Sequence, residues 1–196
     1  ENGNYKYSYF KDYVYRKFKS GGSGFYGWNG LRYFLFEYEE ELMKQRNQPK
    51  ISWNYFIKSS KDKVSIEHIY PQTATADCWE AMFVDVNQSM KKYYNGSLGN
   101  LLPLSSSINS SLQNDCFNDK KKTKKDQNGN VVRSGYANGS YSEQEVSFET
   151  NWGPNEIQER GLKLLSFMES RWKINLGNND QKKDLLHLVE KDKILE

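Results

Sequence analysis

The chain has 196 residues, which is enough for one domain with a core of its own. Its 28 basic and 25 acidic side chains leave a net charge of +3, and this balance does not identify a nucleic-acid partner by itself. Apolar residues make up 36% of the chain and aromatic residues 15%, a composition that favours an ordered domain with a polar surface over a disordered chain.

The sequence has no long apolar run and its first residues lack a signal-peptide pattern, so we expect a soluble, cytoplasmic protein without a membrane partner. Its two cysteines, Cys78 and Cys116, lack the paired spacing of a zinc knuckle. Two thiols fit a reducing compartment, and a single disulfide is the alternative. The chain does not begin with methionine, which suggests a fragment of a longer protein.

The first third of the chain reads as helical. In the aromatic-rich segment Tyr5–Phe18, tyrosines at every fourth position share one helical face. The glycine-rich stretch 20–24 is a linker. A stronger helix is predicted over Gly30–Arg46, whose apolar residues form a stripe, and Ile51–Ser59 is ambiguous between helix and strand.

The middle of the chain predicts two short strands, each followed by a helix. Val64–Ile69 alternates apolar and polar residues until Pro71 stops the strand. Helical patterns follow at 76–94 and 105–118, and the second extended piece, 98–104, lies between them. The lysine-, asparagine- and glycine-rich segment 120–139 reads as an exposed loop.

The last part predicts a long helix over Pro154–Lys173, with proline at its first position, and a short helix over Asp184–Ile194. The fold class is therefore mainly α (α+β): a helical domain with an embedded strand–strand–helix unit. We expect a single domain over residues 1–196, with that unit at about 63–120 and flanking helices at about 5–46 and 154–194.

Glu67 and His68 carry the clearest chemical signal. A neutral imidazole suits a general base near pH 7, and carboxylate and amide oxygens suit Mg²⁺. A histidine alone is more often structural, and in a strand Glu67 and His68 point to opposite faces. Both can serve one site only if the strand ends or bends there, which Pro71 favours.

Three segments in order carry a family resemblance. They are Ile66-Glu-His-Ile-Tyr-Pro-Gln72, Leu98-Gly-Asn-Leu-Leu-Pro-Leu104 and Ile108-Asn-Ser-Ser-Leu-Gln-Asn114, framed by the helices near 30–39 and 148–172. Together they resemble an HNH (ββα-metal) nuclease, and more narrowly the C-terminal nuclease domain of GmrSD-type restriction endonucleases, which target modified phage DNA. The resemblance covers residues 30–173.

The resemblance implies a role for each motif residue. His68 matches the general base, Glu67 the acidic metal ligand, and Asn109 the metal ligand on the helix. Asn100 matches the middle position that braces the loop or orients the histidine. The metal would be Mg²⁺, with Mn²⁺ as a substitute. Asparagine at the third position, where many HNH enzymes have histidine, leaves the metal ligation open.

The last residue of the third motif and the lysines that follow it are candidates for DNA contact. They are Asn114, Lys120, Lys121, Lys122, Lys124 and Lys125. The lysine run is equally typical of a solvated loop, Asn100 of a turn former and Asn109 of a helix cap. The tyrosines and tryptophans are expected in the core, and His187 in a structural role.

The sequence thus predicts a divalent-metal-dependent DNA endonuclease, the effector of a restriction and antiviral defence system. The family often carries a nucleotide-dependent sensor domain, and we expect such a domain, in missing sequence or as a separate subunit, to be a further partner. The alternatives are a catalytically silent DNA-binding or partner-docking module and an RNase using the same site.

Overall fold

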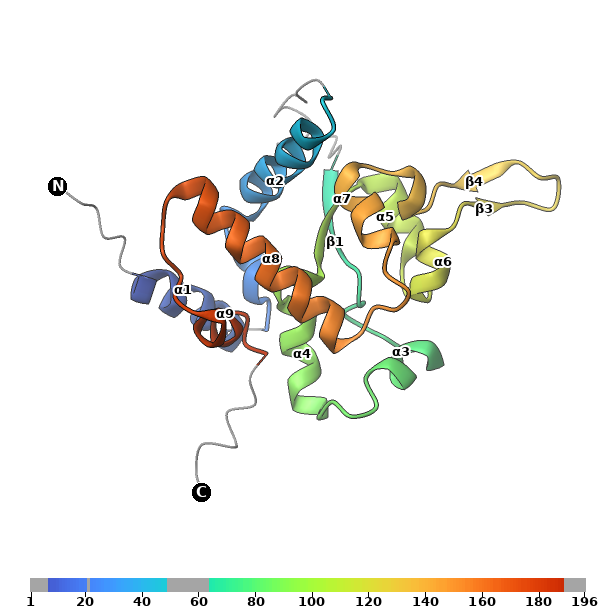
Figure 1. Cartoon of the computed structure of the whole chain (residues 1–196). Coiled ribbons are helices and arrows are strands. Elements are labelled where there is room, and N and C mark those ends of the chain that lie inside the picture. The colour runs from blue at the N-terminus through green and yellow to red at the C-terminus, as the bar shows by residue number, and fades with distance from the viewer. Residues whose placement is uncertain (1–6, 21, 49–63, 189–196) are drawn as a thin grey trace.

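The computed structural model describes residues 7–20, 22–48 and 64–188. Helices surround a small central pair of strands, and a second pair of strands extends from the molecule as a hairpin (Figure 1). The helices in chain order are α1 (Tyr7–Lys19), η1 (Gly24–Gly27), α2 (Leu31–Gln45), α3 (Asp77–Met82), α4 (Gln88–Gly96), η3 (Leu98–Asn100), α5 (Ser106–Leu112), α6 (Phe117–Lys121), η4 (Tyr136–Asn138), α7 (Tyr141–Ser147), α8 (Pro154–Trp172) and α9 (Asn179–Leu185). The predicted mainly helical α+β class is confirmed.

The central sheet consists of β1 (Val64–His68) and β2 (Leu101–Ser105), which pair antiparallel. Their register runs from Val64 opposite Ser105 to His68 opposite Leu101. Helix α5 follows β2 directly and packs against both strands. The predicted strand–strand–helix unit is therefore present, with α3 and α4 inserted between its strands.

Helix α8 crosses the middle of the molecule and supports the sheet region (Figure 1). Its buried face includes Ile157, Leu164 and Met168, as the sequence pattern predicts. Its N-terminal half packs on η3 so closely that a Cβ on Gly99 would lie 1.9 Å from the carbonyl oxygen of Ile157. Only glycine allows this approach, so the family-like Leu-Gly-Asn segment sits directly against α8.

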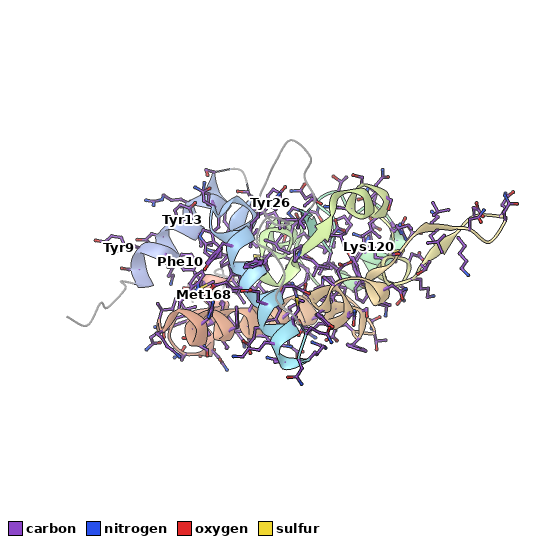
Figure 2. All side chains as sticks on the ribbon, turned by 90° about the horizontal axis from the view of Figure 1, so that it is seen from above. Tyr9, Phe10, Tyr13, Tyr26, Lys120 and Met168 are labelled. Carbon is purple, nitrogen blue, oxygen red and sulfur yellow. A yellow bond between two sulfur atoms is a disulfide. The ribbon has the colours of Figure 1, made fainter. Side chains whose placement is uncertain are left out.

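The expectation that the tyrosines are core residues is wrong for part of the N-terminal region. Helix α1 buries Phe10, Val14 and Phe18, which recur every four residues. Tyr9 lies on the other side of the helix, is 67% exposed and extends from the molecule in Figure 2. Two overlapping four-residue patterns were present in the sequence, and the one without hydroxyl groups is buried.

Two predicted helices are each divided in two. The segment 76–94 breaks between α3 and α4, where the Asn87 side chain accepts a hydrogen bond from the Ser89 backbone N–H at 3.1 Å and caps α4. The segment 105–118 breaks after α5, where Gln113 adopts a positive φ of 40°. Both breaks turn the chain so that the following helix meets the core from another direction.

The remaining differences lie in the second half of the chain. The expected loop at 120–139 contains a hairpin of β3 (Lys124–Lys125) and β4 (Val131–Arg133), and α7 was not predicted. Helix α9 begins before the predicted Asp184–Ile194 helix, and the prediction for Ile51–Ser59 lies outside the described residues. None of the helices in the described ranges combines the length and apolar character needed to cross a membrane.

Candidate functional site

The last two residues of β1 lie on opposite faces of the sheet. Side chains alternate along a strand, so Glu67 and His68 point apart. Their contacts agree with this: Glu67 meets Lys120 of α6 and Tyr136 of η4, whereas His68 meets Tyr26 of η1. The chain bends at Ile69 and Tyr70, after both residues, so the bend does not bring the two side chains to one side.

His68 is held as a neutral imidazole. The ring of Tyr26 lies against it, with ring centroids 4.6 Å apart and the planes tilted by 41°. Burial lowers the pKa of His68 to about 4, and the positive charge of Lys120 adds to this shift. At neutral pH the imidazole therefore lacks the extra proton, which is the state a general base requires.

Glu67 is bound to a buried lysine. The Lys120 ammonium lies 2.6 Å from Glu67 Oε1, and the hydroxyl of Tyr136 approaches the same oxygen at 3.4 Å. The ammonium also donates to the backbone carbonyl oxygens of His68 and Ile69, at 3.4 and 3.1 Å. Burial raises the pKa of Glu67 and lowers that of Lys120, because both charges have lost most of their water.

Asn100 joins the two halves of the site. Its amide is fully buried and bonds both backbone groups of Tyr70: Oδ1 accepts from the N–H at 2.7 Å, and Nδ2 donates to the carbonyl at 2.9 Å. The indole N–H of Trp152 donates to the same Oδ1 at 3.1 Å. Asn100 therefore fixes the chain two residues after His68, and its role in catalysis stays a prediction.

Asn109 lies on the Glu67 face of β1, two residues away along the strand. Its Nδ2 donates to the Ser65 hydroxyl at 2.7 Å, and Ser65 shares a face with Glu67 because the two are separated by one residue. The contact joins α5 to β1 and orients the asparagine amide toward the sheet.

The structure therefore brings Asn109 and Glu67 to one face and leaves His68 on the other. The donor types on the Glu67 face suit a hard cation, but the carboxylate there is already paired with an ammonium, and a second cation beside it would be repelled. The residues as arranged do not fit a metal held by Glu67. Within residues 7–20, 22–48 and 64–188, no group of three or more His, Cys, Asp and Glu side chains could hold a metal ion.

The candidate DNA-contacting residues fall into two groups. Lys122, Lys124 and Lys125 are exposed at the end of α6 and on the hairpin, where contact with DNA stays a prediction. Lys120 departs from the expectation, because its side chain is 0% exposed and binds Glu67.

The other two candidates have contacts within the protein. The Lys121 ammonium donates to the backbone carbonyl of Glu149 at 2.7 Å. Asn114 is half-buried, and its backbone carbonyl oxygen accepts a hydrogen bond from the Trp79 indole at 3.4 Å. For both residues a role in DNA binding stays a prediction.

Sequence reasoning missed three residues that shape the site. Tyr26 covers His68 from the segment after the glycine-rich stretch, Tyr136 contacts Glu67 from the expected loop, and the Arg160 guanidinium donates to the carbonyls of Gly99 and Leu101 at 2.7 and 2.9 Å. Arg160 lies in one of the segments that resemble the family, and this resemblance was the sequence signal that could have identified it. Nothing in the sequence near Tyr26 or Tyr136 points to the motif residues.

The two cysteines form a disulfide, the second of the alternatives left by the sequence. Cys78 lies in α3, and Cys116 is the residue before α6, the helix that carries Lys120. The Trp79 ring, next to Cys78, lies 5.9 Å from the Lys120 ammonium. The disulfide thus ties α3 to the helix that neutralises Glu67.

Comparison with known proteins gives one family. The family described as "GmrSD restriction endonucleases, C-terminal domain" matches residues 9–167, a span that includes every motif residue discussed above. No curated protein and no solved structure matches the chain significantly.

Proposed function

This chain belongs to the family of C-terminal domains of GmrSD restriction endonucleases, and we therefore propose that it is a DNA endonuclease domain of the HNH type. The reaction is hydrolysis of a phosphodiester bond. The single observation that carries the proposal, beyond the family itself, is a neutral histidine at the end of a strand whose following loop is fixed by a buried asparagine.

His68 is the proposed general base. Its low pKa keeps the imidazole free to take a proton from a water molecule, which then attacks the phosphorus in line with the leaving oxygen. Asn100 is a positioning residue, because its hydrogen bonds to Tyr70 hold the loop after His68 in place. Tyr26 shields one side of the imidazole from water.

A divalent cation, Mg²⁺ with Mn²⁺ as substitute, stays part of the proposal. Such an ion would neutralise charge on the scissile phosphate when bound. Because Lys120 is already paired with Glu67, a metal held by Glu67 and Asn109 would require that ion pair to open first.

The pairing of Glu67 with Lys120 is also what favours a second candidate. If the pair never opens, the domain is a catalytically silent DNA-binding or partner-docking module. It would then bind DNA without cutting it under any metal condition.

The wider context is proposed from the family. The substrate would be modified phage DNA, met in the cytoplasm, and the domain would act as the effector of an antiviral restriction system with a nucleotide-dependent sensor domain or subunit. An RNase activity of the same site remains the third candidate.

Plasmid nicking tests the nuclease proposal. Wild type, His68→Ala and Thr75→Ala are compared with Mg²⁺, with Mn²⁺ and with chelator, Thr75 being an exposed residue of the loop after His68 and so a matched control. We expect metal-dependent nicking by wild type and Thr75→Ala, and a loss of about 10²-fold or more with His68→Ala. Equal cleavage by all three proteins would remove His68 from the mechanism. DNA binding without cleavage would favour the silent module, and preferential cleavage of RNA the RNase.

A further inference from the structure

A groove runs beside the loop that follows β1. It has a volume of about 680 Å³, in the range of clefts that hold ligands. One wall comes from the end of α1, a second from α4, and the third from the loop at 70–74. Tyr70 and Trp79, both buried, contribute to its floor.

The groove is linked to His68 through η1 and through the loop that follows β1. His68 contacts Tyr26 of η1, and η1 packs against α1 and α4, the two helices that form the groove's walls. The third wall begins at Tyr70, two residues after His68. A strand in this groove would therefore run beside the loop that follows His68.

The charge of the groove suits a polyanion. Its lining residues include three lysines, Lys19, Lys91 and Lys92, and one acid, Glu80, which leaves an excess of two positive charges. The loop that follows His68 adds the polar side chains of Gln72 and Thr73 to the lining. Lysine and neutral polar side chains are the usual partners of phosphate oxygens.

We propose that this groove binds the backbone of the DNA strand next to the scissile phosphate, with Lys19, Lys91 and Lys92 as the phosphate contacts. The proposal rests on the proposed nuclease function and adds the path of the substrate across the domain. Phosphate contacts fix the register of a strand without reading its sequence. The groove would thus present successive phosphates to His68.

The hairpin is the competing DNA surface. Lys124 and Lys125 lie on β3, and the hairpin extends away from α1 and α4, which form the walls of the groove (Figure 1). DNA held only by the hairpin would not need to approach His68. The two lysine pairs, one on α4 and one on β3, therefore provide a matched comparison.

The test measures DNA affinity in chelator, so that binding is separated from cleavage. A fluorescein-labelled DNA duplex is titrated by anisotropy with wild type, Lys91→Gln/Lys92→Gln and Lys124→Gln/Lys125→Gln over a range of salt concentrations. Each phosphate contact contributes about 0.9 to the slope of log K against log salt, so the α4 pair should lower the slope by about 2 and weaken binding severalfold. The β3 pair should change the slope and the affinity less than the α4 pair does.

Two results would overturn the proposal that the groove binds DNA. One is an α4 variant with the affinity and slope of wild type, and the other is a loss in the β3 variant equal to or greater than that in the α4 variant. Tighter binding of a single-stranded RNA of the same sequence than of the DNA duplex would overturn the choice of DNA. Unchanged thermal melting of both variants shows that the comparison concerns binding.

The experiments distinguish an error in the groove proposal from an error in the nuclease proposal. If wild type nicks DNA but the α4 variant binds and nicks as well as wild type, the groove is wrong and the nuclease stands. If wild type never nicks but the α4 pair carries the salt slope, the nuclease proposal is wrong and the groove remains the DNA site.

Discussion

The buried pair of Glu67 and Lys120 gives the most direct test of how the site is held. Replacing Lys120 by Met keeps most of the side-chain volume but removes the ammonium, leaving Glu67 buried without its cation. Breaking a buried pair from one side costs about 3–5 kcal/mol. The lost hydrogen bond to the Ile69 carbonyl places the expected value toward the upper end.

The size of the protein converts this loss into a measurable shift. A loss of 1 kcal/mol lowers the melting temperature of a domain of this length by roughly 2–4 °C, so Lys120→Met should melt at least about 6 °C below wild type. Urea unfolding followed by circular dichroism gives the free energy directly. The control Lys122→Met changes an exposed lysine two residues away and should remain within about 0.5 kcal/mol of wild type.

A double variant separates charge from packing. Glu67→Gln/Lys120→Met removes both charges, so the uncompensated carboxylate no longer exists, and we expect it to regain at least half of the stability lost in Lys120→Met. If Lys120→Met unfolds like Lys122→Met, or if the double variant is no more stable than the single, the ion pair does not hold this region together.

The remaining predictions concern the disulfide, a buried acid and a close contact. Cys78 and Cys116 close a loop with a sequence separation of 38, so reducing the disulfide should lower the free energy of unfolding by about 4 kcal/mol. Thermal melting with and without reductant measures this loss. The control variant Cys78→Ser/Cys116→Ser should melt at the same temperature in both conditions. Burial raises the pKa of Glu143 from 4.5 to about 7, so the carboxyl group binds its proton more tightly in the folded state than in the unfolded state. The contribution of this protonated carboxyl to stability is fully present below pH 4.5 and is lost as the pH rises through 7. Between pH 4.5 and 8, the free energy of unfolding measured with urea should therefore fall less for Glu143→Gln than for wild type. Equal falls in the two proteins would show that Glu143 does not cause the pH dependence. Gly99→Ala should lower the free energy of unfolding by at least about 1–3 kcal/mol, because the added methyl group would clash with the Ile157 carbonyl oxygen of α8. Thermal melting measures this loss, and a melting temperature equal to that of wild type would show that η3 and α8 can move apart at no cost.

The sequence by itself determined the local features of this protein. The stripe of apolar residues defined α2, and Pro154 with the following pattern defined α8, because helical periodicity and end signals act within a few residues. The three motif segments and the strand ending at His68 were readable for the same reason. The prediction of the buried face was wrong where two apolar patterns overlapped, as in α1. Which of two such faces is buried depends on the elements that pack against the helix.

Tertiary structure alone decided which side chains meet. Glu67 and His68 are adjacent in sequence, yet the pleat sends one to Lys120, 53 positions later, and the other to Tyr26, 42 positions earlier. No local pattern marks Lys120 as buried, because five of the six residues at 120–125 are lysines and only the fold selects one of them to neutralise a carboxylate. Partner choice for a charged group depends on the geometry of the assembled chain, and that geometry is set by the packing of α6 and η4 beside β1.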